Sequence, residues 1–126
     1  MDRTQLMRRV LRVTAVLNFG AALLFAFPGS SLGRLAGLPS PVPYLYAIFT
    51  AFMVALFGAT YAWLSRQPSI DRPLIAFSAI GKSGFFVIAC VCWRLGEVPP
   101  LTVVMASGDL LFAAIFASWL LSADRQ

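Results

Sequence analysis

The sequence contains no histidine, only two cysteines and few charged residues. Of its 126 residues, 12% are charged and 60% are hydrophobic, and the mean hydropathy is +0.82. A soluble domain of this size needs a more polar surface. Cysteine–histidine zinc sites need histidine, and the disulfide frameworks of small secreted domains need more than two cysteines. The composition therefore argues against a metal centre and a disulfide scaffold, and it favours a membrane protein.

Four long apolar runs dominate the chain. Each has about the ~20 residues that cross a hydrocarbon core as an α-helix. Prolines fill the connections, and the second, third and fourth runs each follow a proline, which is a favoured position at a helix start. The expected spans are Arg9–Phe27, Tyr44–Leu64, Leu74–Trp93 and Leu101–Leu121.

Between the first two runs, leucines recur every third residue from Leu32 to Leu38, with Arg34 among them and Gly37 near the end. This pattern predicts a short interfacial helical turn within Ser30–Leu38. The sequence therefore predicts an all-α integral membrane four-helix bundle, with that turn between helices 1 and 2. Residues 1–126 are expected to form a single transmembrane domain.

The distribution of arginine predicts the orientation. With the N-terminus inside, the cytoplasmic side holds seven arginines and the outer side holds two, Arg34 and Arg94. This positive-inside bias, together with aromatic residues at both expected boundaries, predicts a multi-pass protein of the bacterial inner membrane with both termini in the cytoplasm. The seven cytoplasmic arginines are Arg3, Arg8, Arg9, Arg12, Arg66, Arg72 and Arg125.

A cleavable signal peptide is the alternative for the first run, because a basic start and an apolar stretch precede Pro28-Gly29-Ser30. Against this alternative, Asn18 interrupts the apolar stretch and no clean cleavage site follows. Four helices are therefore the preferred interpretation.

Lys82 and Asp109 fall near the centres of the third and fourth spans. A charge at mid-membrane costs ~2.5 to 3.5 kcal/mol on the insertion scale, so such residues normally pair or face water. The two spans must run antiparallel, which leaves an axial offset of about 5 Å that a lysine side chain can cover. Asn18 has a similar depth in the first span, so we expect a buried polar cluster of Asn18, Lys82 and Asp109. Three alternatives are open for these residues: a structural lock, a site for a proton, an ion or a ligand, or no contact at all.

Small residues mark the expected packing surfaces. In the second span alanine recurs at every fourth position, with Gly58 alongside. Glycines also flank both charged residues, so close helix approach is expected at their level. The predicted packing residues are Ala47, Ala51, Ala55 and Ala59, together with Gly81, Gly84 and Gly108.

Other chemistry-bearing patterns are few. Cys90 and Cys92 are two apart on a predicted helix, which turns them ~200° from each other and argues against a redox pair or a shared metal. Four aromatic residues near the charges are candidate lining for a flat ligand such as a quinone, although aromatic residues at helical spacing are far more often core or lipid-facing. They are Phe85, Phe86, Phe112 and Phe116.

Four short motifs resemble those of small bacterial inner-membrane proteins of the DoxX-like group. They are Asn18 in the first span, Leu35-Ala-Gly-Leu-Pro39 in the first loop, Gly81-Lys82, and Gly108-Asp-Leu-Leu-Phe-Ala113. The resemblance covers most of the chain and implies a four-helix bundle. Some members of the wider group are associated with respiratory or thiol-stress assemblies, but this chain lacks a matching redox cysteine motif.

These observations leave three functions open. The first is a non-enzymatic accessory or oligomeric subunit whose polar cluster specifies packing. The second is a small proton-coupled or solute-moving oligomer in which Asp109 titrates opposite Lys82. The third is a quinone- or lipid-binding membrane protein. The expected partners are the lipid bilayer and either a second copy or another membrane protein. No catalytic motif, metal site, cofactor or nucleic-acid contact is expected.

Overall fold

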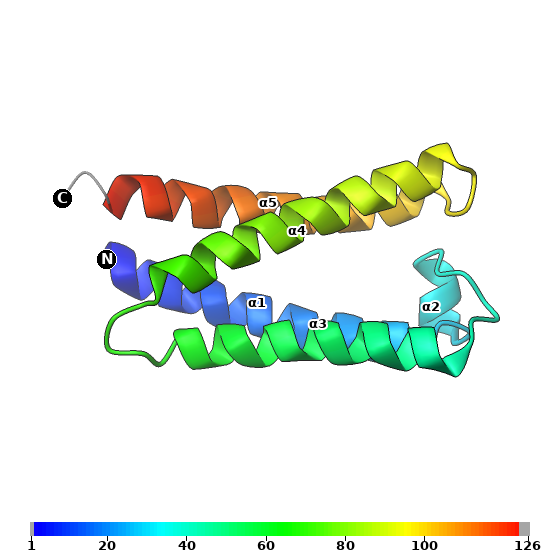
Figure 1. Cartoon of the computed structure of the whole chain (residues 1–126), viewed down its shortest axis with the longest axis horizontal. Coiled ribbons are helices and arrows are strands. Elements are labelled where there is room, and N and C mark those ends of the chain that lie inside the picture. The colour runs from blue at the N-terminus through cyan, green and yellow to red at the C-terminus, as the bar shows by residue number, and fades with distance from the viewer. Residues whose placement is uncertain (1, 124–126) are drawn as a thin grey trace. The chain divides into compact units, whose positions relative to one another are not determined.

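The structure is a computed structural model that describes residues 2–123, so the predicted cytoplasmic Arg125 lies outside the described residues. Every regular element in this range is an α-helix, which confirms the predicted all-α class with four long apolar helices and a short one between the first two (Figure 1). The helices are α1 (Arg3–Ala26), α2 (Ser31–Leu35), α3 (Tyr44–Leu64), α4 (Arg72–Arg94) and α5 (Pro100–Ala123).

The four long helices are long and apolar enough to cross a membrane. They contain 21 to 24 residues, which corresponds to about 31 to 36 Å of helix against a hydrocarbon core of about 30 Å. Large hydrophobic side chains are exposed along these helices, including Val16, Ile80 and Leu111. Length, composition and exposed apolar surface are those of a multi-pass membrane protein.

The helix ends predicted from hydropathy agree with the structure for some helices and differ from it for others. The prediction for α3 matches at both ends, whereas α1 begins at Arg3 rather than Arg9. Arginine, glutamine and methionine are good helix formers, so the helix continues beyond the apolar stretch into the basic segment. α3 starts directly after Pro43 and α5 starts directly after Pro99, as predicted, whereas α4 begins at Arg72, before Pro73. Asp71 replaces proline as the start signal of α4, because its carboxylate accepts a hydrogen bond from the backbone N–H of Leu74 at 3.0 Å.

Two glycines end helices in the left-handed conformation. Gly37 has φ 77° after α2, and Gly96 has φ 79° after α4. Beyond each glycine, a second backbone N–H reaches back into the last turn, from Leu38 to the carbonyl of Gly33 and from Glu97 to that of Cys92. This pairing satisfies helix-end carbonyls and favours glycine. It also confirms the short helical turn predicted between residues 30 and 38.

The chain divides after Ile70 into two compact units. The first contains α1, α2 and α3, with α1 and α3 packed side by side; the second contains α4 packed against α5. That both units form one membrane domain stays a prediction. In each unit the long helices form an antiparallel pair (Figure 1).

Gly58 marks a close approach of α1 and α3. A Cβ atom at this position would lie 3.2 Å from the Cβ of Asn18 and 3.3 Å from the carbonyl oxygen of Ala15. The predicted alanine stripe behaves differently, since Ala47 is buried, Ala51 and Ala55 are half-buried, and Ala59 is exposed. A spacing of four residues advances 400°, so the stripe rotates around the helix instead of following one face.

We expect Gly58→Leu to destabilise the α1–α3 pair by ~1–3 kcal/mol, because its side chain overpacks the interface. Gly20→Leu is the matched control, since nothing lies within 4 Å of a Cβ placed at Gly20. Thermal unfolding in detergent measures the melting temperatures of the two variants. Equal melting temperatures for the two variants would contradict this assignment.

Candidate functional site

The strongest candidate site is the ion pair between α4 and α5. The Nζ atom of Lys82 lies 2.6 Å from Oδ1 of Asp109. The lysine side chain is buried, with 6% exposed, whereas that of Asp109 is 28% exposed. The predicted contact between these two residues is confirmed.

The helix pair brings these two charges together at mid-span. Lys82 lies ten residues after Arg72, the first residue of α4, and Asp109 lies nine residues after Pro100, the first of α5. A turn at residues 95–99 returns the chain antiparallel to α4. Each charge is therefore about 14 to 15 Å along its helix, near the centre of a hydrocarbon core of about 30 Å.

An aromatic ring adds a second contact to the lysine. The Nζ atom of Lys82 lies 5.6 Å from the centroid of the Phe112 ring. Phe112 follows Asp109 by three residues, so the carboxylate and the ring project from neighbouring positions on α5. A desolvated ammonium gains about 2 kcal/mol over an aromatic face. Lys82 is thus held by a charge and by a ring quadrupole.

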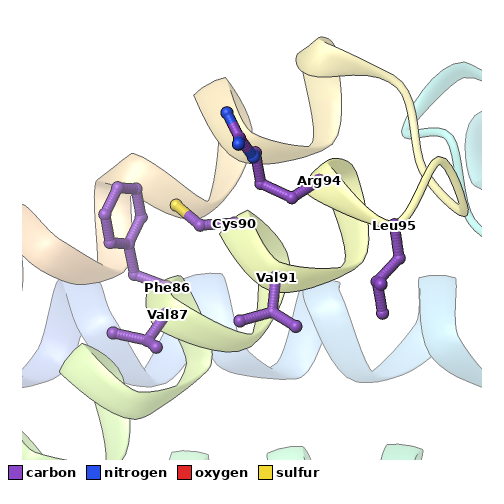
Figure 2. Close-up of a pocket in the computed structure, with 6 residues that line it drawn as sticks. All are labelled: Phe86, Val87, Cys90, Val91, Arg94 and Leu95. Carbon is purple, nitrogen blue, oxygen red and sulfur yellow. The ribbon is translucent and has the colours of Figure 1, made fainter.

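The other three candidate aromatics have different surroundings. Phe116 is completely buried, and Phe85 is half-buried. Phe86 lines an open groove on α4, where Figure 2 shows its ring on the same side of the helix as Cys90 and Arg94. A shared aromatic cavity formed by these residues and Phe112 stays a prediction.

Asn18 lies in the first unit. Its side-chain Nδ2 donates a hydrogen bond to the backbone carbonyl of Val54 at 3.1 Å, and its Cβ adjoins Gly58. The amide therefore ties α1 to α3 at their close approach. The predicted inclusion of Asn18 in one cluster with Lys82 and Asp109 spans both units and stays a prediction.

The glycines near the ion pair face open space. Nothing lies within 4 Å of a Cβ placed at Gly84 or at Gly108, and Gly81 is exposed. Gly84 and Gly108 therefore do not provide the close α4–α5 approach that their positions in the sequence suggest. Gly84 is turned about 160° around α4 from Lys82, and Gly108 is turned about 100° around α5 from Asp109, so both point away from the ion pair and leave surface where another helix can approach.

Arg8 has a structural role that sequence reasoning missed. Its guanidinium donates to the carbonyl oxygens of Ser65 at 3.0 Å and Pro68 at 3.1 Å, just after the end of α3. A cation at a helix C-terminus satisfies free carbonyls and complements the helix dipole. The positive-inside count identifies this arginine as basic and juxtamembrane, but its partners are almost sixty residues away.

Arg72 has the equivalent role in the second unit. Its guanidinium donates to the carbonyl oxygen of Leu120 at 3.0 Å and lies 5.8 Å from the centroid of the Trp119 ring. The start of α4 is thereby fastened to the last turns of α5. The sequence signals here are a tryptophan and an arginine at the same expected membrane boundary.

The two cysteines are free and half-buried, and Cys90 lies in the α4 groove. Among residues 2–123, no group of three or more histidine, cysteine, aspartate or glutamate side chains is arranged to hold a metal ion. Comparisons with protein-family models, curated proteins and solved structures find no match. The function must therefore be argued from the site itself.

We expect Lys82→Met and Asp109→Leu each to lower the free energy of unfolding by ~3–5 kcal/mol, because each leaves one charge unpaired at the middle of the helix pair. The double variant should recover most of that loss, since replacing both partners removes the uncompensated charge. Thermal unfolding of the four proteins in detergent completes the mutant cycle. Four equal stabilities would show that the pair contributes no stability.

Proposed function

We propose that this chain is a non-enzymatic subunit of the bacterial inner membrane that acts as a homo-oligomer or as an accessory to another membrane protein. The supporting observation is the incomplete burial of Asp109, whose side chain is 28% exposed beside a lysine that is only 6% exposed. The pair lies at the middle of helices long enough to span a membrane.

Membrane energetics favour a partner at this position. A charge near the bilayer centre is costly and usually faces a protein interior or water. Lys82 neutralises Asp109 but does not enclose it. A helix from a second chain would remove the exposed part of the carboxylate from the hydrocarbon and can donate a further hydrogen bond to it.

The surface next to Asp109 suits such a helix. Gly108 precedes it, and no atom lies within 4 Å of a Cβ placed there. Val104, one turn earlier on α5, is 64% exposed. Transmembrane helices associate through small residues that let backbones approach closely, so this flank of α5 favours contact with another helix.

The cytoplasmic position of both termini is part of the same proposal. It is supported by the seven-to-two arginine bias. The resemblance to the DoxX-like group stays a prediction and supplies no activity to this proposal.

We expect a cysteine at Val104 to form a cross-link between chains in native membranes. The background is Cys90→Ser with Cys92→Ser, and the control is Leu110→Cys, an exposed position about 120° around α5 from Val104 and about 160° from Gly108. A disulfide dimer identifies a homo-oligomer, and a larger adduct identifies a different membrane protein. Gly108→Leu should abolish either product, because it occupies the contact surface. No cross-link at Val104, or equal cross-linking at Leu110, would contradict the proposal.

A second candidate function is a proton-coupled or solute-moving oligomer with Asp109 as the titrating group. The observation that favours it is that Asp109, unlike Lys82, is reachable from outside the helix pair. Lys82 would then act as its counter-charge.

Proton flux in reconstituted vesicles separates the two functions. A transporter predicts flux with the wild type that Asp109→Asn abolishes while the variant keeps its helical circular dichroism. The subunit function predicts that both proteins leave the flux at the level of protein-free vesicles. Wild-type flux that Asp109→Asn removes would therefore replace the first proposal by the second.

A further inference from the structure

An open groove runs along the second half of α4, apart from the Lys82–Asp109 pair. Its volume is about 290 Å³. Figure 2 shows two rows of side chains that diverge from the helix, with residues four apart in each row. Such i±4 rows are the ridges of a helix surface, and the space between them is a natural channel for a narrow apolar chain. One row is Phe86, Cys90 and Arg94, and the other is Val87, Val91 and Leu95.

The groove lies at the depth of one membrane leaflet. Arg94 follows Lys82 by twelve residues, which places it about 18 Å along the axis from mid-span, whereas half of a hydrocarbon core is about 15 Å. Trp93 is beside it and 43% exposed, as expected of a residue at the headgroup boundary. The apolar lining from Phe86 to Val91 therefore lies within the acyl-chain region, and the arginine lies at the phosphate level.

The guanidinium of Arg94 is available to bind an anion. It is exposed, and it makes no hydrogen bond or ion pair with the part of the chain that the structure describes. The last carbonyls of α4 do not need it, since Gly96 N–H donates to Trp93 and Glu97 N–H donates to Cys92. By contrast, Arg8 and Arg72 are committed to helix-end carbonyls.

We propose that this groove binds one acyl chain of an anionic phospholipid whose phosphate pairs with Arg94. The volume is small for a compact drug-sized ligand, whose sites occupy about 300 to 1,000 Å³, but it suits part of a single extended chain. The guanidinium can form charge-assisted hydrogen bonds with the phosphate of either headgroup. It favours an anionic headgroup over a zwitterionic one, because the zwitterionic headgroup adds a positive charge that repels the arginine and cancels the charge of the phosphate. The inference depends on the membrane setting of α4 and not on the proposed partner of α5.

Native mass spectrometry of the detergent-solubilised protein tests this site. Phosphatidylglycerol and phosphatidylcholine with identical acyl chains are the two probes. The wild type should retain phosphatidylglycerol about fivefold more strongly, the factor that corresponds to one basic residue at a membrane surface. Arg94→Gln should abolish that preference, whereas Arg34→Gln, which changes an exposed arginine on α2, should preserve it.

A second pair of variants tests the groove independently of charge. Val87→Trp fills it and should reduce retention of both lipids, whereas Val16→Trp makes the same change on α1. Val87 and Val16 are 57% and 70% exposed, so neither change disturbs a core. Equal retention of the two lipids by the wild type, or a preference that survives in Arg94→Gln, would overturn the proposal. The proposal would also be overturned if Val87→Trp lowered the fraction of oligomeric protein and left the amount of bound lipid unchanged, because a second chain would then occupy the groove.

Discussion

Lys82 and Asp109 meet between the middles of two predominantly apolar helices, at a separation of 2.6 Å. An unpaired charge is energetically costly in a hydrocarbon core. The helices α4 and α5 are therefore suited to the membrane only when they pair in this register. The ammonium of Lys82 also lies over the Phe112 ring, whereas nothing lies within 4 Å of a Cβ placed at Gly84 or Gly108.

Hydropathy and depth predicted much of this fold because they depend on local composition. The bounds of α3 and the existence of α2 follow from the sequence alone, and the contact of Lys82 with Asp109 follows from two charges at matching depths on adjacent antiparallel spans. The start of α1 was placed too late, because arginine is disfavoured by hydrocarbon and not by the helix.

Features that depend on helix rotation were harder to predict. A four-residue alanine spacing looks like a packing stripe, but it drifts around α3, and the close approach to α1 occurs at Gly58. Gly84 and Gly108 are close to the charged residues in the sequence, but one or two residues turn a helix by 100° to 200°, so neither glycine points at the ion pair. The partners of Arg8 and Arg72 require tertiary register, since each arginine reaches a helix end distant in sequence.

The outer surface of the second unit combines two kinds of site. At mid-span, Asp109 and Gly108 offer a polar atom beside an open backbone, which favours another helix. Toward the end of α4, the apolar groove ends at Arg94, whose guanidinium is available to an anion, which favours a lipid with a negative headgroup. Both sites lie on the exposed surface of α4 and α5, whereas the face between the two helices contains the charge pair.

The most direct test of the account is the stability of a charge-reversed protein, Lys82→Asp with Asp109→Lys, measured by thermal unfolding in detergent beside the two single reversals. Each single reversal places two like charges between α4 and α5 and should unfold at a much lower temperature than the wild type. If the pair governs this contact, the double reversal should unfold well above both single reversals, because opposite charges meet again. A double reversal no more stable than the singles would show that the helices are held together by other contacts.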